Sequence, residues 1–311
     1  MTRTYVITGA TSFLGRKLVQ RLLAGGNTIY AICRNHGKAV QMLGDNRNLI
    51  ILECELSRYE QLAEKIVSAD VFIHLAWDGT DHGGRNMADV QRQNVLHCQE
   101  ALRQAISIGC QLFVEAGSQA EYGILQAMIT EESPCKPFSE YGKAKLEVCR
   151  NGFDMAEMGS IKYLHLRIFS LYGEDDHPWT LVMSCVQKML HNEPIDLSAC
   201  TQNWNFLYVD DAARQIEGLI DNAVSNPNYR HEIYNIASND TRVLKDFVLS
   251  MKNVCHSSSL LKFGEVVPEH LISLNPNVSK TANVVGTIDT VKFETVIHRI
   301  LVKYKNNDKG I

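Results

Sequence analysis

The chain has 311 residues, 45% of them hydrophobic and 21% charged, with 31 basic and 35 acidic side chains. This length fits one large α/β unit or two domains, and the composition excludes collagen, coiled-coil and disordered chains. The net charge of -4 argues against a nucleic-acid partner, and the apolar runs are too short for a membrane span. Nine cysteines without a CxxC pair indicate reduced thiols and no metal site. Because the chain enters a strand-like run without a secretory leader, we expect a cytoplasmic protein.

Short β-branched runs alternate with helical periodicity through the first half of the chain. We expect strands at residues 5–8, 28–32, 49–53, 69–75, 112–116 and 163–169, and helices at residues 14–23, 91–108 and 141–158. Strands separated by helices of this length require crossover connections. The pattern therefore predicts an α/β fold: a Rossmann-type doubly wound parallel sheet, covered on both faces.

The regular alternation of strands and helices ends after Tyr172. Beyond it we expect helices at 181–191 and 209–224 and a strand at 232–237, separated by irregular segments. We predict a dinucleotide-binding domain at residues 1–171, to which segments near 207–237 return. A smaller, interleaved C-terminal substrate domain would then consist of residues 172–206 and 238–311. No internal repeat or long linker interrupts this arrangement.

The turn between the first strand and the first helix has the pattern of a phosphate-binding loop. A dinucleotide pyrophosphate binds at such a helix amino terminus. Gly9 would permit the tight turn, Gly15 would let the helix approach the sheet, and Ser12, in place of a middle glycine, could donate to phosphate. A glycine-containing turn without a ligand is the alternative, and the strand–loop–helix context favours the cofactor. We assign the following residues to cofactor binding: Gly9, Thr11, Ser12, Phe13, Leu14 and Gly15.

The residues after the second strand favour NADP over NAD. An NAD enzyme places an acidic side chain there to hold the ribose hydroxyls. This chain has Cys33 followed by Arg34, whose guanidinium can pair with a 2′-phosphate. An arginine merely exposed at a strand end is the alternative. Further along the chain, Glu55 and Leu56 suit the adenine edge, and Leu75 and Ala76 suit the nicotinamide-ribose end.

Tyr141 and Lys145 stand four residues apart at the start of a long predicted helix, so they share one face of it. A tyrosine hydroxyl is a weak acid–base catalyst at neutral pH, and a neighbouring ammonium favours its phenolate form. Ser118 ends the preceding strand, where ligands bind in open α/β sheets, and could hydrogen-bond a carbonyl oxygen. Together the three residues would support hydride transfer beside a nicotinamide. A solvated helix face is the alternative for the Tyr–Lys pair.

With these motifs the chain resembles extended short-chain dehydrogenase/reductases of the NAD-dependent epimerase/dehydratase family, whose members act mostly on nucleotide sugars. The resemblance runs nearly end to end and includes residues 9–15, 74–76, 94–95, 118–123, 141–145, 166–173, 206–211 and 234–236. It implies that Ser118, Tyr141 and Lys145 are the catalytic set and that Lys145 also holds the nicotinamide ribose. It further implies a homodimer formed through the helices at 91–108 and 141–158.

The resemblance leaves several reactions to compare. Dehydratases of this family carry an Asp-Glu pair directly after the catalytic hydroxyl residue, where this chain has Gln119 and Ala120. The 4-epimerases typically have the missing acidic ribose ligand, an asparagine at Ser170 and a diphosphate-binding arginine at Trp204. These departures disfavour a dehydratase and weaken an epimerase. Three other arginines could bind the diphosphate instead: Arg214, Arg230 and Arg242.

The segments at 118–123 and 204–211 are similar to those of ketoreductases acting on CDP- or dTDP-linked 4-keto-6-deoxyhexoses. We therefore expect an NADPH-dependent 4-ketoreductase of a nucleotide sugar, in which Tyr141 protonates the new alkoxide and Ser118 orients the carbonyl. The alternatives are an NAD-dependent 4-epimerase and a dinucleotide-sensing or scaffold protein of the same fold. The candidate substrate-binding residues are Trp77, Gln119, Ser170 and Trp204.

Overall fold

The computed structural model describes residues 2–81 and 83–307 of the chain. A seven-stranded sheet with the order β10-β6-β5-β4-β1-β2-β3 forms its centre, and the paired strands all run parallel. Its strands are β1 (Thr4–Thr8), β2 (Thr28–Cys33), β3 (Leu49–Glu53), β4 (Val71–His74), β5 (Leu112–Ser118), β6 (Lys162–Ile168) and β10 (His231–Ile236). The predicted doubly wound parallel sheet is confirmed.

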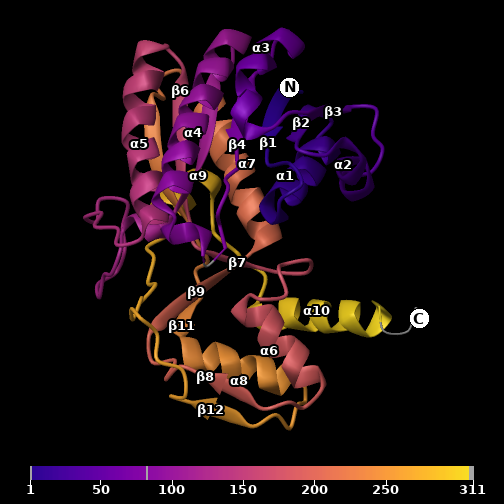
Figure 1. The fold of residues 1–311 in the computed structure, drawn as a ribbon, viewed down its shortest axis with the longest axis vertical. Coiled ribbons are helices and arrows are strands. Elements are labelled where there is room, and N and C mark those ends of the chain that lie inside the picture. The colour runs from indigo at the N-terminus through magenta and orange to yellow at the C-terminus, as the bar shows by residue number, and fades with distance from the viewer. Residues whose placement is uncertain (1, 82, 308–311) are drawn as a thin grey trace.

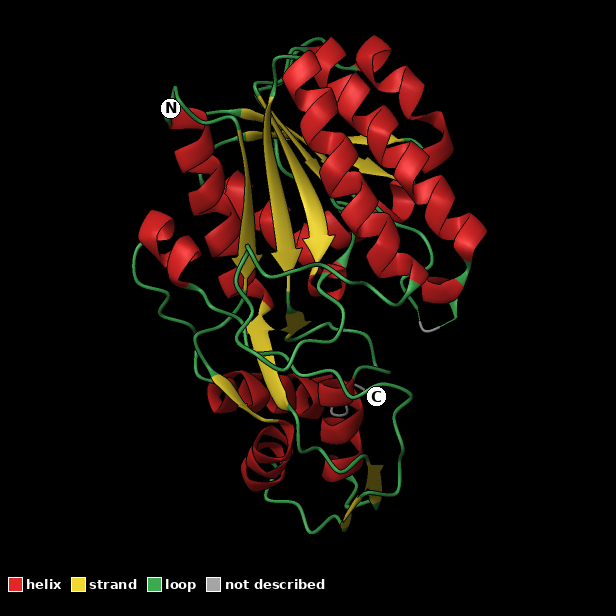
Figure 2. Cartoon of the chain, turned by 90° about the vertical axis from the view of Figure 1, so that its left-hand side faces the viewer, coloured by secondary structure: helices red, strands yellow, loops and turns green. Residues whose placement is uncertain are grey.

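Helices cover both faces of this sheet (Figure 2). The side chains of β1 alternate between the two layers, since Ile7 packs in a core with α1 and α7 whereas Val6 packs in a core with α4 and α5. The helices of this region are α1 (Phe13–Ala24), α2 (His36–Leu43), α3 (Leu62–Lys65), α4 (Ala88–Ile108), α5 (Glu140–Met158) and α7 (Val209–Ser225), with 3₁₀ turns η1 (Leu56–Gln61), η2 (Gly84–Asn86) and η3 (Gln119–Glu121). Among the described residues, no helix has the length and apolar composition needed to cross a membrane.

A smaller part of the molecule lies below the sheet in Figure 1. Two short sheets lie there, one with the order β11-β9-β7 and one formed by β12 and β8. Their strands are β7 (Ser170–Tyr172), β8 (Ile195–Leu197), β9 (Asn203–Tyr208), β11 (Thr241–Val243) and β12 (Leu261–Phe263). The accompanying helices are α6 (Leu181–Leu190), α8 (Leu244–Val254) and α10 (Phe293–Asn307), whereas α9 (Ser279–Val285) contacts β10 and α7. The division of the chain into domains at residue 171 stays a proposal.

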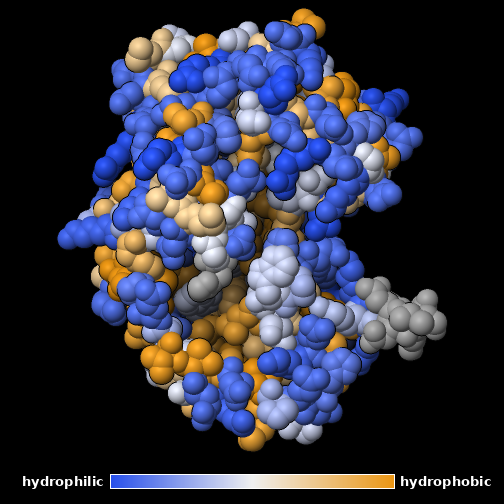
Figure 3. All heavy atoms as spheres, in the orientation of Figure 1, coloured by the Kyte–Doolittle hydropathy of each residue, from blue (hydrophilic) through white to orange (hydrophobic). Residues whose placement is uncertain are grey.

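The carboxyl ends of the central strands face this smaller part, as the arrowheads in Figure 2 show. The surface is hollowed between the two parts (Figure 3). Open parallel sheets bind their ligands outside this edge. The fold therefore places the predicted cofactor loop, which follows β1, and Ser118, which ends β5, along one side of the hollow.

Candidate active site

The loop between β1 and α1 is built tightly enough to require both of its predicted glycines. Gly9 has a φ of 66°, and a Cβ there would lie 2.8 Å from the amide nitrogen of Ala76. A Cβ on Gly15 would lie 2.2 Å from the carbonyl oxygen of Gly9. The hydroxyl oxygen of Ser12 accepts a hydrogen bond from the Gly15 amide at 3.0 Å and thereby caps α1. Because this hydrogen bond uses the hydroxyl only as an acceptor, the hydroxyl hydrogen of Ser12 can still donate to a ligand.

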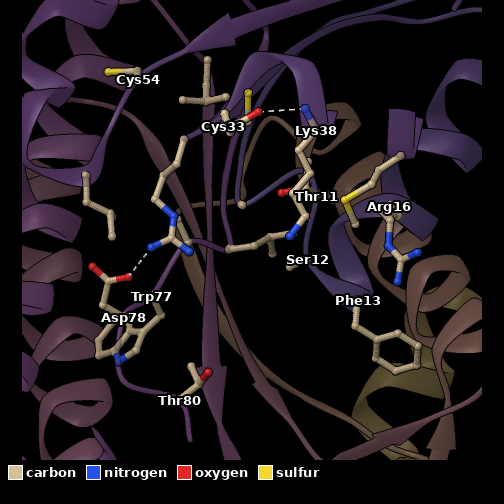
Figure 4. Close-up of a pocket in the computed structure, with 18 of the residues that line it drawn as sticks. Thr11, Ser12, Phe13, Arg16, Cys33, Lys38, Cys54, Trp77, Asp78 and Thr80 are labelled. Carbon is tan, nitrogen blue, oxygen red and sulfur yellow. Dashed lines mark hydrogen bonds and ion pairs between the residues drawn. The ribbon is translucent and has the colours of Figure 1, made fainter. Parts of the chain in front are cut away.

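A cavity of about 590 Å³ opens at this loop (Figure 4). Most of the residues predicted to bind the cofactor line it: Gly9, Thr11, Ser12, Phe13, Arg34, Leu56, Leu75 and Ala76, together with Trp77. Leu14 and Gly15 are buried beneath the loop, and Glu55 is exposed beside Leu56. These motifs thus meet at one cavity, whereas Tyr141 and Lys145 are not among its lining residues. The cofactor roles of all these residues stay proposals.

Three cationic side chains line the same cavity. Arg34 forms an ion pair with Asp78 across it, with 3.3 Å between Nη1 and Oδ1. Lys38, on the first turn of α2, points into the cavity (Figure 4). Arg16 also lines the cavity; its Nη2 donates to the carbonyl oxygen of Asp175 at 3.4 Å, and its Nε is buried without a partner among the described residues. An orphaned guanidinium nitrogen and two further cations around a glycine-built loop fit a phosphate-bearing dinucleotide. Lys38 was not predicted from the sequence, although it lies only four residues after Arg34.

Lys145 lies at the carboxyl end of β5. Its ammonium donates to the carbonyl oxygen of Ala116 at 2.5 Å and to Oε1 of Glu115 at 3.3 Å. The same ammonium lies 3.4 Å from the ring centroid of Trp77, a favourable cation–π position. Since Trp77 lines the cavity, Lys145 lies directly against one of the residues of the predicted cofactor site.

Tyr141 packs beside Lys145, one turn earlier on α5. Its ring lies 5.9 Å from that of Trp77, edge to face, and the guanidinium carbon of Arg85 lies 4.8 Å from its centroid. The first turn of α5 meets the segment after Ser118 closely, because a Cβ on Gly142 would lie 2.5 Å from a backbone oxygen there. The structure therefore brings the predicted tyrosine, lysine and serine together at the end of β5.

Ser118 is held by a buried charged cluster. Its amide donates to Oε1 of Glu121 at 2.8 Å, and Glu121 in turn meets His165 Nε2 at 2.9 Å and Arg167 Nε at 2.8 Å. Burial alone would raise the pKa of Glu121, but the charges and hydrogen bonds of His165 and Arg167 lower it to about 2. Burial would likewise lower the pKa of His165, and the Glu121 carboxylate instead raises it to about 10. Both oxygens of the Glu121 carboxylate therefore have buried partners, and Glu121 positions Ser118 instead of serving as the acid or base of a dehydratase.

The candidate substrate residues lie at different depths. Gln119 and Ser170 are half-buried, on η3 and β7 at the carboxyl edge of the sheet. Trp204, on β9, packs against two hydrophobic clusters, with its ring 6.3 Å from that of Phe206 and its buried Nε1 unpartnered among the described residues. Packing accounts for the position of Trp204, so its contact with substrate stays a prediction.

The three arginines considered for the diphosphate are already engaged or distant. Arg230 precedes β10 and therefore lies at the amino edge of the sheet, opposite the cavity. Arg214 pairs with Asp211 at 2.8 Å. Arg242, beside Trp204 in the sheet register, pairs with both Asp240 and Glu294 at 2.6 Å. The geometry thus disfavours Arg230 and leaves Arg214 on α7 and Arg242 on β11, both of which are already paired with carboxylates.

The fold and this site define a dinucleotide-binding α/β enzyme with a Ser–Tyr–Lys set at the carboxyl edge of its sheet. Residues 5–237 match the NAD dependent epimerase/dehydratase family, and the chain belongs to that family. It is an NAD(P)-dependent enzyme of the extended short-chain dehydrogenase/reductase type, as the resemblance predicted.

Relatives and solved structures agree with this assignment. CDP-abequose synthase from Salmonella muenchen is 24% identical, with 86% of this chain and 85% of the relative covered. A dTDP-6-deoxy-L-talose 4-dehydrogenase (NAD(+)) from Aggregatibacter actinomycetemcomitans is 25% identical, and the match covers 69% of this chain and 79% of that relative. The crystal structure of UDP-glucuronic acid 4-epimerase from Bacillus cereus superposes with a TM-score of 0.85 at 20% identity, covering 97% of this chain and 99% of that one. At 20% identity, the similarity to the epimerase structure shows only that the two proteins share a fold.

Proposed function

We propose that this protein is an NADPH-dependent 4-ketoreductase of a nucleoside-diphosphate-linked 4-keto-6-deoxyhexose. One observation carries the proposal: Tyr141 and Lys145 are assembled with Ser118 beside a cavity that Arg34 and Lys38 line with positive charge. The relatives support the substrate class, since one is named for a CDP-linked sugar and another for oxidation at C4 of a dTDP-linked 6-deoxyhexose. Ketone reduction at C4 is the reverse of that oxidation.

The cations favour NADPH. Arg34 and Lys38 approach the cavity from the end of β2 and the first turn of α2, and Asn35 caps that helix by accepting from the Lys38 amide at 2.8 Å. A 2′-phosphate placed there would meet two cationic side chains and a helix amino terminus. On binding it, Arg34 would exchange its exposed partner Asp78 for the phosphate. A reductase needs such an exchangeable cofactor at every turnover.

The chain's own residues account for the proton chemistry. NADPH supplies the hydride when bound. Tyr141 gives its hydroxyl proton to the oxygen at C4, Lys145 faces the nicotinamide ribose, and the Ser118 hydroxyl orients the ketone. The Ser118 hydroxyl oxygen accepts from the Ala120 amide at 3.2 Å, which leaves its hydrogen available to donate. The Trp77 ring packs against both the lysine and the tyrosine.

Two measurements test this function. Mass spectrometry of nucleotide released from freshly purified protein, beside titrations with NADPH and NADH, should find no tightly held NAD and a clear preference for NADPH. A 4-keto-6-deoxyhexose linked to CDP or dTDP should then be reduced, and Tyr141→Phe should abolish that turnover. Stoichiometric NAD surviving purification would replace the reductase with an internally recycling 4-epimerase. Nucleotide binding without turnover on any 4-keto sugar would favour a sensing or scaffold role.

We also propose a homodimer formed through α4 and α5, which lie side by side on one face of the sheet (Figure 1). Leu96 of α4 is 49% exposed on this face, whereas Ala101, Ile108, Leu146 and Cys149 are buried in the chain's own core. Light scattering should give twice the chain mass, and a charged residue at Leu96 should lower it to that of one chain.

A further inference from the structure

A buried carboxylate lies directly behind the lysine of the catalytic set. Glu115 belongs to β5, three residues before Ser118, and is fully buried. Its Oε1 accepts from Lys145 Nζ at 3.3 Å, and its Oε2 accepts from Cys98 Sγ at 2.9 Å. An unpaired carboxylate at such a depth would be strongly unfavourable. The ammonium on one oxygen and the thiol on the other are what allow this carboxylate to be buried.

Several titratable groups surround the Glu115–Lys145 pair: His74, His97, Cys98 and Tyr163. Arg85 lies further out, against the ring of Tyr141. Burial lowers the pKa of His74 to about 4 and lowers that of His97 as well. Burial raises the pKa of Cys98 and of Tyr163 well above their usual values, and Glu115 adds to both effects. At neutral pH His74 is therefore uncharged and Cys98 and Tyr163 keep their protons, so none of these three adds a charge beside the Glu115–Lys145 pair.

We propose that Glu115 is a positioning residue for Lys145, which it holds at the carboxyl end of β5 while offsetting part of its positive charge. The carboxylate and the Ala116 carbonyl hold the ammonium from behind, and the Trp77 ring fixes the side that faces the cavity. Lys145 is thereby fixed at the carboxyl end of β5, against Trp77 of the cavity wall, before any cofactor arrives, and its field on Tyr141 is moderated. The effect on the reaction rests on the proposed reductase function, whereas the effect on cofactor binding rests only on the family.

The first test measures binding to cofactor-free protein. Glu115→Gln keeps the size and one acceptor but removes the charge, and Cys98→Ala is the matched control because it leaves the carboxylate–ammonium pair in place. For Glu115→Gln we expect the Kd for NADPH to rise about tenfold, as for one weakened charge-assisted hydrogen bond. Adenosine 2′,5′-bisphosphate, which lacks the nicotinamide ribose, should bind as tightly as to the unchanged protein. Equal weakening of both ligands, or of neither, would overturn the proposal.

The second test is the pH dependence of ketone reduction. Because the tyrosine must be protonated to act as an acid, activity falls as pH rises on the alkaline side. Removing the Glu115 charge leaves the Lys145 field on Tyr141 less compensated, so this fall should move to lower pH by about one unit. An unchanged profile would overturn the charge-offsetting role. If the unchanged protein reduces no 4-keto sugar, the proposed function fails and the binding test still decides the role of Glu115.

Should Glu115→Gln not fold, Glu115→Asp carries the same test. Its shorter carboxylate stays charged but draws back from the ammonium of Lys145. We then expect the selective loss of NADPH affinity without the shift in the pH profile. Wild-type affinity for NADPH in a folded Glu115→Asp protein would contradict the positioning role.

Discussion

Gly117→Ala should disrupt the buried cluster that holds Ser118. A Cβ at this position would lie 2.2 Å from Nε2 of His165 and 2.6 Å from Oε1 of Glu121, where ordinary contacts begin at 3.4 Å. His165 must therefore move by about 1.2 Å, the difference between 3.4 and 2.2 Å, which breaks its 2.9 Å contact with Glu121. Overpacking a core costs about 1–3 kcal/mol, and disturbing a buried charge pair costs about 3–5 kcal/mol.

We expect Gly117→Ala to lower the free energy of unfolding by about 3 kcal/mol and Tm by about 6–12 °C. Because the Ser118 amide loses its acceptor, kcat/KM should also fall by about tenfold or more. Thermal unfolding followed by circular dichroism and steady-state kinetics measure the two effects. Gly37→Ala is the matched control, since its Cβ would lie 3.7 Å from the nearest atom and should leave Tm unchanged or slightly raised. A Gly117→Ala protein with the Tm and activity of the unchanged protein would refute this account.

Three further predictions follow from the site. The folded-state pKa of His165 is raised from 6.5 to about 10, so its contribution to stability is complete below pH 6.5 and is lost as pH rises toward 10. The free energy of unfolding, measured with urea, should therefore fall more steeply between pH 6.5 and 10 in the unchanged protein than in His165→Gln. Replacing Arg34 and Lys38 by alanine should weaken NADPH binding by about 30- to 100-fold and NADH binding by less than about threefold in calorimetric titrations. Ser12→Ala removes the cap on α1 and should cost about 1 kcal/mol in chemical denaturation, whereas an undiminished midpoint would contradict the capping role.

The sheet and the cofactor loop were predictable because local patterns determine them. Hydrophobic runs of four to seven residues indicate buried strands, and the positive φ of Gly9 before a helix marks a tight turn, so both features can be recognised from short stretches of sequence. The Tyr141–Lys145 spacing likewise follows from the helical repeat. The fold and the candidate catalytic residues could therefore be predicted from these local patterns.

The buried charges were not predictable in the same way. Glu115 was read only as part of a strand, although an acid inside a strand buried on both faces signals a partner elsewhere. That partner, Lys145, is 30 positions away, and the pairing depends on how α5 crosses β5. Glu121 directly follows Gln119 and Ala120 in the sequence, and its role comes from His165 and Arg167 on β6. Long-range contacts of this kind require the three-dimensional structure.

The Trp77 ring is a built-in optical reporter of this site. It lines the cofactor cavity, lies under the ammonium of Lys145 and meets the ring of Tyr141 edge to face. The chain has three tryptophans, and Trp179 stacks on His177, another residue of the cavity wall. Indole emission overlaps the absorption of a reduced nicotinamide, so a bound NADPH would quench the protein's fluorescence and gain emission of its own. Occupancy, release and exchange between the oxidised and reduced cofactor can therefore be followed in real time without any label.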